Sequence, residues 1–582
     1  MKPQRAFLGS VFTTVVHSTA LDELCTPSHV QASLPANGSI SGIAPIPSSV
    51  TANAVYNASV SVSDNYPAAT FDYCNVTFSY THVGRNDIVN LQYWLPSPDK
   101  FQKRYLATGG GGFAINSGTM MLPSGLQNGA VAGVTDGGFG SFSTQLDAIF
   151  LLANGTINYE PLFMFGYRAI GEQTKVGKAL AKNFFSMNST EKLYTYYQGC
   201  SEGGREGWSQ VQRYPEEYDG VIPGAPAFRF AQQQVQHLYS NVVEQTLDYY
   251  PSTCEFDKIA NETIKACDSL DGKTDGVVAR TDLCILQFNV SSLVGTPYFC
   301  TASAGSSPFP GGPAGSPTPV QNGTISAKGA EVAQTILNGL HDSQGRRAYI
   351  SYQPATTFVD GATKYNNITG EWELSINSMG GEYVTKFLQL VNISNLPNLD
   401  NVTYDTLRDW MQQGWTMYED TLQTTLPDLT PYQSKGGKVL HWHGESDNSI
   451  PTGSSVHYHE SVRSVMYPSL SFNESSAALS DWYKLFLVPG AAHCATNPLQ
   501  PNGAFPNTNL AVMIDWVENA VEPSTLNATH LTGSNLGAQE QLCAWPLRPY
   551  YSGNATSPAC VYDQKSIDSW MYDFNAYKLP LY

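Results

Sequence analysis

Three motifs that lie far apart in the sequence contain the residue types of a serine-based catalytic triad. Ser201 lies in Gly199-Cys200-Ser201-Glu202-Gly203, a G-x-S-x-G pattern typical of a nucleophile elbow. Asp447 follows the strand-like segment 438–440, and His493 follows the apolar run 485–488 and a Pro-Gly turn. These residues predict acyl transfer by a serine nucleophile, with His493 as the base and Asp447 as its orienting partner.

The elements around Ser201 are those that a nucleophile elbow requires. Residues 192–198 are rich in Tyr and Thr and predict a strand, residues 205–213 predict a short helix, and residues 220–222 begin another strand. Because the chain has 50 glycines, a chance G-x-S-x-G around a structural serine is the alternative. The strand, turn, helix and strand in succession, with the chain order Ser, Asp, His, favour an α/β-hydrolase fold.

A run of four glycines at positions 109–112 follows the strand-like segment 104–107. It resembles the position of an esterase oxyanion loop, in which backbone N–H groups stabilise the developing negative charge. A flexible glycine linker is the alternative. We expect the oxyanion donors to be the N–H groups of Glu202, Gly110 and Gly111.

Composition limits the classes of partner. The chain has 582 residues, a net charge of −18 and only 14% charged residues. An acidic surface argues against nucleic acid and anionic membranes as partners. Lys2 and Arg5, the apolar segment 6–16 and the small residues 18–20 predict a secretory signal peptide over residues 1–20. No later stretch is apolar for the ~18 residues that a membrane span needs, so we expect a secreted, extracellular protein.

Sequons and cysteines agree with secretion. Ten cysteines form an even number, as expected in an oxidising compartment. The sequence does not prove their pairing; our hypothesis is Cys25–Cys74, Cys200–Cys494, Cys267–Cys284 and Cys543–Cys560, with Cys254–Cys300 left by elimination. The N-x-S/T sequons, where we expect glycosylation, are at Asn37, Asn57, Asn75, Asn154, Asn188, Asn261, Asn289, Asn322, Asn367, Asn392, Asn401, Asn473, Asn527 and Asn554.

The long segment between the Ser201 and Asp447 motifs predicts an inserted domain. About 200 residues separate the strand after Ser201 from the strand before Asp447, far more than a crossover helix needs. We therefore expect a catalytic domain in two parts, residues 21–227 and 432–582, with a lid domain at 228–431. Within the lid, Ser303–Asn322 is rich in Gly, Pro and Ser and predicts a disordered or glycosylated surface loop.

Two segments contain residue types that bind metal ions. Asp268, Asp271 and Asp275 lie with two glycines in a short turn, and such oxygen ligands suit Ca²⁺. A solvated Asp/Gly turn is the alternative, and the spacing is not that of an EF-hand. His441 and His443, at i and i+2, point to one face of a strand and are zinc candidates. Since no third ligand is near in sequence, we interpret them as strand-end residues beside Asp447.

The whole mature chain resembles the fungal tannase and feruloyl esterase family. The signature is Cys200-Ser201, Asp447 and His493-Cys494, and the glycine run 109–113, segment 165–168 and the aspartate loop 268–277 agree with it. Segments 194–207, 246–251 and 441–451 are similar to the tannase branch. The resemblance implies an α/β-hydrolase fold with a lid and a Cys200–Cys494 disulfide. It also implies structural Ca²⁺ bound by Asp268, Asp271 and Asp275 with the carbonyls of Lys273 and Val277.

The expected activity is hydrolysis of galloyl esters and depsides of plant polyphenols through an acyl-enzyme, with no organic cofactor. The first alternative is a feruloyl esterase that acts on hydroxycinnamate esters with the same triad. The second, of another class, is an inactive glycosylated binding protein with a hydrolase fold. The intact triad argues against the latter. The oligomeric state is not predicted.

Overall fold

The computed structural model describes residues 20–305, 317–553, 555 and 557–582. The predicted signal peptide, residues 1–20, lies outside the described residues except for Ala20, which begins helix α1 (Ala20–Leu24). The sequon residue Asn554 also lies outside them. Both predictions therefore stay predictions. No helix in the described part of the chain is long and apolar enough to cross a membrane.

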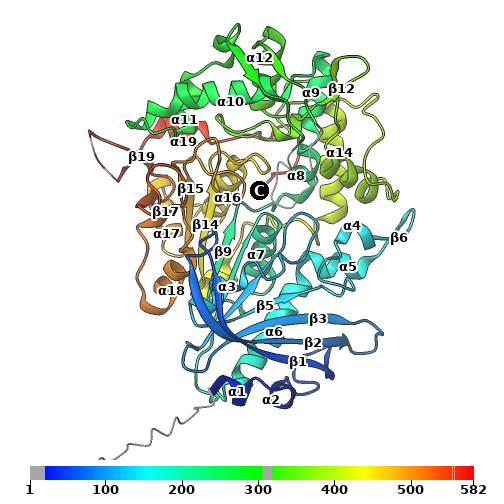
Figure 1. Ribbon diagram of the computed structural model, residues 1–582, viewed down its shortest axis with the longest axis vertical. Helices are drawn as coiled ribbons and strands as arrows, with labels where there is room; N and C mark the ends of the chain where they lie inside the picture. Colours follow the sequence, from blue (N-terminus) through cyan, green and yellow to red (C-terminus); the bar gives the residue numbers. More distant parts are fainter. Residues whose placement is uncertain (1–19, 306–316, 554, 556) are drawn as a thin grey trace, which may run out of the picture.

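A nine-stranded sheet in the order β1-β2-β3-β5-β4-β8-β9-β14-β15 forms the centre of the body (Figure 1). The pairs from β1 to β5 are antiparallel, whereas all pairs from β5 to β15 are parallel. Parallel strands bring their carboxyl ends to one edge, where α/β proteins place their sites. The strands are β1 (Ile43–Val60), β2 (Ala69–His82), β3 (Val89–Pro96), β4 (Arg104–Thr108), β5 (Ala130–Thr135), β8 (Tyr194–Cys200), β9 (Gly220–Gly224), β14 (Lys438–Gly444) and β15 (Tyr483–Val488).

Helices cover both faces of the parallel strands, which are buried and apolar for that reason. Tyr197 and Val221 belong to the apolar layer that includes residues of α6 and α7. Their neighbours Tyr196 and Ile222 point the other way, into a second layer with α3 and α18. The helices of the body include α3 (Leu122–Gln127), α5 (Tyr159–Phe163), α6 (Ala169–Phe184), α7 (Glu202–Arg213), α16 (Thr452–Met466), α17 (Phe472–Ser480) and α18 (Asn509–Asn519).

The segment 228–431 leaves the body after β9 and returns at β14, and its described strands form only two-stranded sheets. In Figure 1 it is the green to yellow part, at the end of the molecule opposite β1–β3. Its main elements are α8 (Phe230–Gln236), α9 (Tyr239–Leu247), α10 (Thr253–Cys267), α11 (Thr281–Gln287), β10 (Pro297–Cys300), β11 (Gln321–Thr324), α12 (Ala327–Asn338), β12 (Lys364–Asn366), β13 (Glu371–Glu373), α13 (Ser378–Glu382), α14 (Tyr404–Tyr418) and α15 (Thr430–Ser434). We refer to this segment as the lid.

Buried polar contacts join the lid to the body. The Arg548 guanidinium donates to Asp282 Oδ1 (3.1 Å) and to Glu445 Oε2 (2.6 Å). Thr281 donates to the same Glu445 oxygen at 2.6 Å. Because Glu445 lies two residues before Asp447, these contacts couple the position of α11 to the loop that carries the predicted catalytic aspartate.

The C-terminal part of the chain adds a small antiparallel sheet and a hairpin to the body. The elements are β16 (Ala504–Phe505), β17 (Thr525–His530), β18 (Gln539–Cys543), β19 (Arg548–Tyr550), β20 (Ala559–Val561) and α19 (Gln564–Ser569). The five predicted disulfides are all present: Cys25–Cys74, Cys200–Cys494, Cys254–Cys300, Cys267–Cys284 and Cys543–Cys560.

Two sequence predictions need correction. Helix α7 begins at Glu202 rather than near residue 205, because the chain turns into the helix directly after Ser201. The predicted surface loop Ser303–Asn322 is partly a hairpin: Gln321 and Asn322 begin β11, which pairs antiparallel with β10, and Ser303 bridges to Thr318. The backbone hydrogen bonds of these residues are thus satisfied by sheet pairing rather than by water. Residues 306–316 of that loop lie outside the described part.

Candidate active site

Ser201 lies in the sharp turn between β8 and α7. Its backbone angles, φ 66° and ψ −123°, are in a region that side chains rarely adopt, and such conformations occur mainly at functional sites. The turn requires close packing of main chains: a Cβ on Gly203 would lie 2.9 Å from the Gly110 carbonyl oxygen, and one on Gly204 would lie 2.3 Å from that of Gly224. The glycines of the predicted elbow therefore allow α7 to approach its neighbours.

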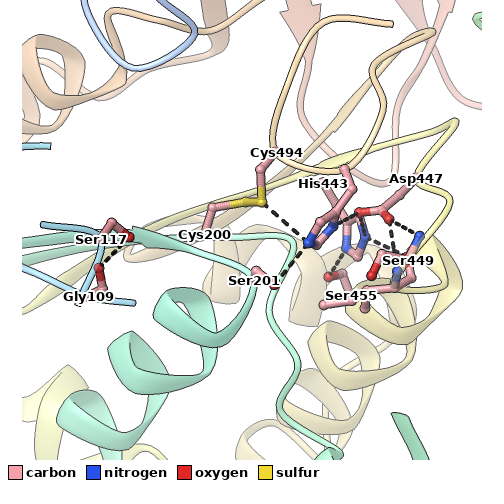
Figure 2. The surroundings of a disulfide bond; sticks show 11 residues. Gly109, Ser117, Cys200, Ser201, His443, Asp447, Ser449, Ser455 and Cys494 are labelled. Carbon is pink, nitrogen blue, oxygen red and sulfur yellow. Dashed lines mark hydrogen bonds and ion pairs between the residues drawn. A yellow bond between two sulfur atoms is a disulfide. The ribbon is translucent and has the colours of Figure 1, made fainter. Parts of the chain in front are cut away.

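The structure brings Ser201, His493 and Asp447 together after the carboxyl ends of β8, β15 and β14; Figure 2 shows Ser201 and Asp447 in this arrangement. His493 Nε2 lies 2.9 Å from Ser201 Oγ, and His493 Nδ1 lies 2.8 Å from Asp447 Oδ2. With Nδ1 protonated towards the carboxylate, Nε2 is free to accept the hydroxyl proton of Ser201. This is the hydrogen-bonded arrangement that a nucleophile, a base and an orienting group need.

Asp447 is held ionised within a fully buried site. Its Oδ1 accepts the N–H groups of Ser449 and Ile450, each at 2.8 Å. Burial favours the neutral acid, but His493 and the hydrogen bonds from His443 and His493 outweigh it and hold the pKa of Asp447 well below its usual value. The carboxylate is therefore available to stabilise an imidazolium on His493 during catalysis.

His443 has a role at this site that the sequence did not reveal. Its Nε2 lies 3.1 Å from Asp447 Oδ2, and its Nδ1 lies 2.6 Å from Ser455 Oγ. Ser455 also contacts His441 Nε2 at 2.8 Å. The two histidines do share one face of β14, as predicted, but they form a hydrogen-bonded chain to the catalytic aspartate. His441 and His443 lie two residues apart on one face of β14, and Asp447 follows His443 by four residues. This spacing is the signal in the sequence that could have indicated a contact between His443 and Asp447.

The predicted oxyanion donors are only partly available. The Glu202 N–H has no hydrogen-bond acceptor among the described residues, as a free oxyanion donor requires. The predictions for Gly110 and Gly111 are wrong, because the Gly110 N–H donates to Glu206 Oε2 (2.9 Å) and the Gly111 N–H donates to the Ala114 carbonyl (3.2 Å). The Gly112 N–H, next in the same loop, has no acceptor in the described part of the chain.

Glu206 anchors this glycine loop to the elbow. Its buried carboxyl group accepts the Gly110 N–H and the Tyr197 hydroxyl, while the Gly203 N–H donates to the Gly110 carbonyl at 3.0 Å. Burial raises the pKa of Glu206 well above its usual value, and the nearby Glu202 carboxylate adds to that shift. Glu206 lies one helical turn beyond Glu202, and its role depends on contacts that are distant in sequence.

The disulfide between Cys200 and Cys494 lies directly against His493, the predicted catalytic base. Its Cα atoms are 6.0 Å apart, and Cys494 Sγ lies 3.7 Å from His493 Nε2 (Figure 2). The bond joins the residue before the nucleophile to the residue after the base. It therefore limits how far Ser201 and His493 can move apart.

Helix α8 of the lid brings a row of polar side chains to the Asp447 loop. Gln233 Nε2 donates to the Ser449 carbonyl at 2.6 Å. The amide oxygens of Gln233 and Gln234 are buried and have no hydrogen-bond partner among the described residues. Such unpaired buried groups are costly and need a ligand or water to satisfy them.

The predicted calcium loop has an uncompensated negative charge. Asp268 and Asp271 are buried, and Lys273 is paired with Asp275 (2.8 Å). Burial raises the pKa of Asp271 to about 7, and the charges of Asp275 and Asp268 add to this effect. The donor set of carboxylate and carbonyl oxygens fits a hard divalent cation that would relieve this repulsion.

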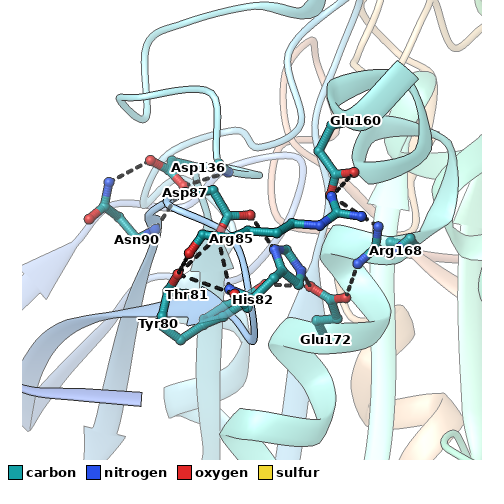
Figure 3. Close-up of polar contacts among 11 residues, drawn as sticks. Tyr80, Thr81, His82, Arg85, Asp87, Asn90, Asp136, Glu160, Arg168 and Glu172 are labelled. Atoms are coloured by element: carbon teal, nitrogen blue, oxygen red, sulfur yellow. Dashed lines mark hydrogen bonds and ion pairs between the residues drawn. The ribbon is translucent and has the colours of Figure 1, made fainter. Parts of the chain in front are cut away.

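A tighter cluster elsewhere is neutralised by protein charges. This cluster consists of His82, Asp87 and Glu160, whose possible ligand atoms all lie within 4.8 Å of one another. No other group of three such residues in the described part of the chain is as compact, so Asp268, Asp271 and Asp275 of the predicted calcium loop are more widely spaced. Figure 3 shows that Arg85 and Arg168 both reach Glu160. His82 bridges Asp87 and Glu172, and these ion pairs leave the cluster without excess charge.

Comparison with known proteins shows the family to which this chain belongs. The family model described as tannase and feruloyl esterase matches residues 74–567. The chain belongs to this family. It is 54% identical to a tannase of Aspergillus oryzae, with 97% of each chain covered. It is 31% identical to a probable feruloyl esterase of Arthroderma benhamiae, with 87% of each covered.

Solved structures of family members have the same fold. A tannin acyl hydrolase from Aspergillus niger matches with a TM-score of 0.93 and 59% identity, covering 97% of this chain and 99% of that one. A feruloyl esterase B from Aspergillus oryzae matches with a TM-score of 0.68 and 24% identity, covering 91% and 100%. The predicted α/β-hydrolase fold and the resemblance to this family are thereby confirmed.

The triad geometry predicts the effect of removing the nucleophile. Ser201→Ala should lower kcat by about 10⁴-fold or more, because no other group can form the acyl-enzyme. The melting temperature should stay within a few degrees of the native value. The Asp447→Asn variant should also have a kcat about 10⁴-fold lower, because an asparagine side chain favours the wrong tautomer of His493. Ester hydrolysis at native rates by Ser201→Ala would show that the nucleophile lies elsewhere.

The Cys200–Cys494 disulfide should affect catalysis as well as stability. A displacement of about 1 Å at a reacting centre can lower the rate ~100-fold, so we expect the Cys200→Ala/Cys494→Ala variant to lose about 10- to 100-fold in kcat/KM. The assay temperature must be one at which circular dichroism shows a folded protein.

The remote Cys543–Cys560 bond provides the matched control. Cys543→Ala/Cys560→Ala should lower the melting temperature, because it also removes a crosslink, but should leave kcat/KM within about twofold. Equal losses of kcat/KM in the two variants would mean that the Cys200–Cys494 bond only stabilises the fold.

Proposed function

We propose that this protein is a carboxylic ester hydrolase that cleaves galloyl ester and depside bonds of tannins and releases gallic acid. The single observation that carries the substrate class is the 54% identity to a tannase over 97% of both chains. The assembled Ser201–His493–Asp447 triad supports the ester hydrolase activity. An inactive binding protein would have no need for this geometry.

The mechanism follows from the positions of the three side chains. His493 Nε2 takes the proton of Ser201 as Oγ attacks the ester carbonyl, and Asp447 stabilises the imidazolium. The Glu202 N–H and a second N–H of the glycine loop, for which Gly112 is the free candidate, stabilise the oxyanion. His493 then protonates the leaving alcohol. Water, deprotonated by His493, then attacks the acyl carbon. The bond from that carbon to Ser201 Oγ breaks, His493 returns the proton to Oγ, and the acid is released.

The unpaired amide oxygens on α8 support an acyl group that carries hydroxyls. Gln233 contacts the loop after Asp447, so this row of glutamines faces the same end of the sheet as the triad. A site with buried polar groups rejects analogues that leave them unpaired, because the missing hydrogen bonds are not replaced by water. A trihydroxybenzoyl group offers three donors, whereas a feruloyl group has one hydroxyl and one methoxy group. This favours gallate over the feruloyl alternative.

Methyl esters provide the test of acyl-group preference. We expect kcat/KM for methyl gallate to exceed that for methyl 3,4,5-trimethoxybenzoate and methyl ferulate by at least about 10-fold each, since each lost hydrogen bond to a buried partner costs about 1–3 kcal/mol. The Ser201→Ala variant serves as the control for hydrolysis that does not depend on the triad. A higher kcat/KM for methyl ferulate would replace the proposed activity with that of a feruloyl esterase.

We also propose a structural Ca²⁺ held by Asp268, Asp271 and Asp275 with the carbonyl oxygens of Lys273 and Val277. The buried excess charge of this loop and its closure by Cys267–Cys284 support the proposal. Bound Ca²⁺ would neutralise the aspartates and stabilise the lid; it takes no part in the steps above.

Chelation tests the calcium proposal. EDTA should lower the melting temperature by several degrees, and added Ca²⁺ should restore it, because a ligand that binds only the folded state stabilises it. The Asp271→Asn variant should have a lower melting temperature than the native protein even without EDTA, and EDTA should change it little. The Asp420→Asn variant, changed at an exposed position elsewhere in the lid, should have the melting temperature and the EDTA response of the native protein. A native protein whose melting temperature is unchanged by EDTA contradicts the site.

We further propose that the protein is secreted and glycosylated. Five disulfides support an oxidising compartment. Of the fourteen sequon asparagines, the thirteen in the described part all lie at least partly exposed, where glycans can be accommodated. Endoglycosidase should move a diffuse gel band of the secreted protein towards the mass of the polypeptide without its signal peptide, slightly below the 63.3 kDa of the full chain. An unmoved band would show that the sequons are unused.

A further inference from the structure

A cavity of about 630 Å³ lies between the lid and the catalytic histidine. On the lid side its wall includes Asp257 and Phe256 of α10 and Phe358. On the body side it includes Asn448, next to Asp447, and His493 itself. Volumes in this range are typical of sites for small organic molecules.

The position of His493 in the wall shows which part of an ester this cavity can receive. In acyl transfer the histidine returns the Ser201 proton to the leaving oxygen, so the alcohol part of the ester must lie beside His493. Ser201 and Glu202 are not among the residues that line the cavity. The cavity is therefore on the leaving-group side of the triad, whereas the acyl group lies towards the elbow and the oxyanion donors.

The lid wall is rigid and has an aromatic surface. The rings of Phe256 and Phe358 stack with centroids 4.7 Å apart and an interplanar angle of 17°. The Cys254–Cys300 disulfide, which also lines the cavity, joins α10 to β10 with a Cα separation of 6.0 Å. A wall held in this way loses little entropy when a ligand binds.

Asp257 is the carboxylate in this wall. The residue is exposed towards the cavity, and its side chain makes no hydrogen bond or ion pair with any described residue. Desolvation by its surroundings raises the pKa of Asp257 to about 6, so the carboxylate form is the major one above that pH. A carboxylate only accepts hydrogen bonds, and its bonds with hydroxyl donors are about twice as strong as those between neutral groups. An unpaired carboxylate beside an aromatic wall suits a ligand that combines hydroxyl groups with a flat or apolar face.

We propose that this cavity binds the alcohol part of the ester and that Asp257 is a specificity-determining residue, whose carboxylate accepts hydrogen bonds from hydroxyl groups of that part. The inference rests on the proposed function. Two kinds of alcohol share this chemistry: a polyol such as glucose, and the phenolic ring of a second galloyl group in a depside. In methyl gallate the alcohol part is only methanol, which has neither a polyol nor a phenolic ring, so this ester does not use the subsite.

The test compares Asp257→Asn with the native protein on three substrates of the same acyl group. These are methyl gallate, monogalloyl glucose and methyl digallate. We expect kcat/KM to fall about 10- to 100-fold for one or both of the larger substrates, the loss expected for hydrogen bonds to a charged group. The methyl gallate value should change less than twofold. Asp420→Asn, an unpaired exposed aspartate of the lid outside the cavity, is the matched control.

The pattern of losses identifies the alcohol. A loss on monogalloyl glucose alone assigns a polyol subsite, a loss on methyl digallate alone assigns a phenolic one, and a loss on both assigns a subsite for either. An equal loss on all three substrates, or no loss on any, overturns the inference. If the native protein hydrolyses no galloyl ester, the proposed function fails instead.

A measurement on the native protein does not depend on how the variant folds. Added glucose should intercept the galloyl-enzyme and form galloyl glucose at lower concentrations than methanol forms methyl gallate, if the subsite binds a polyol; pyrogallol should do so if it binds a phenol. Asp257→Asn should lose this advantage. Interception no better than that by methanol for both hydroxylated alcohols overturns the inference.

Discussion

The left-handed backbone of Ser201 is the constraint on which the active site depends, because it exposes the nucleophile only if three other segments pack closely around the turn. Gly203 and Gly204 let α7 approach the glycine loop and β9. Glu206, one turn further on, holds the Gly110 amide. Cys200, just before the turn, is bonded to Cys494, which follows His493. One strained residue thus sets the positions of nucleophile, oxyanion loop and base.

The body and the lid contribute different parts of the site. The parallel strands β8, β14 and β15 carry the triad at their carboxyl ends, where a rigid sheet holds side chains from distant parts of the chain. The lid adds the groups that we propose select a substrate: unpaired amides on α8 and the carboxylate of Asp257 on α10. Buried contacts of Thr281 with Glu445 and of Asp282 with Arg548 hold the lid against the body.

Local patterns predicted the elements that position the triad. The strands around residues 194–200 and 438–444 were predicted, because short runs of β-type residues are a local signal. An even number of cysteines predicts that disulfides form but not which cysteines pair; the hypothesis for the five pairs is confirmed by the structure. The start of α7 and the β10–β11 hairpin were missed. Their residues have the composition of turns and loops, and only pairing with partners in the structure satisfies their backbone groups.

The sequence by itself was enough to predict that Ser201, Asp447 and His493 form a triad, because their chain order and flanking strands are those of one fold, and the three side chains do meet in the structure. Only the tertiary structure decided which neighbours serve them. Gly110 and Gly111 looked like free oxyanion donors, yet Glu206 and Ala114 accept their N–H groups. His443 was predicted to lie at a strand end beside Asp447, but only the structure shows that it also donates a hydrogen bond to that carboxylate. A hydrogen bond is chosen by distance and direction between groups that can be far apart in sequence, and these are known only when the chain has folded.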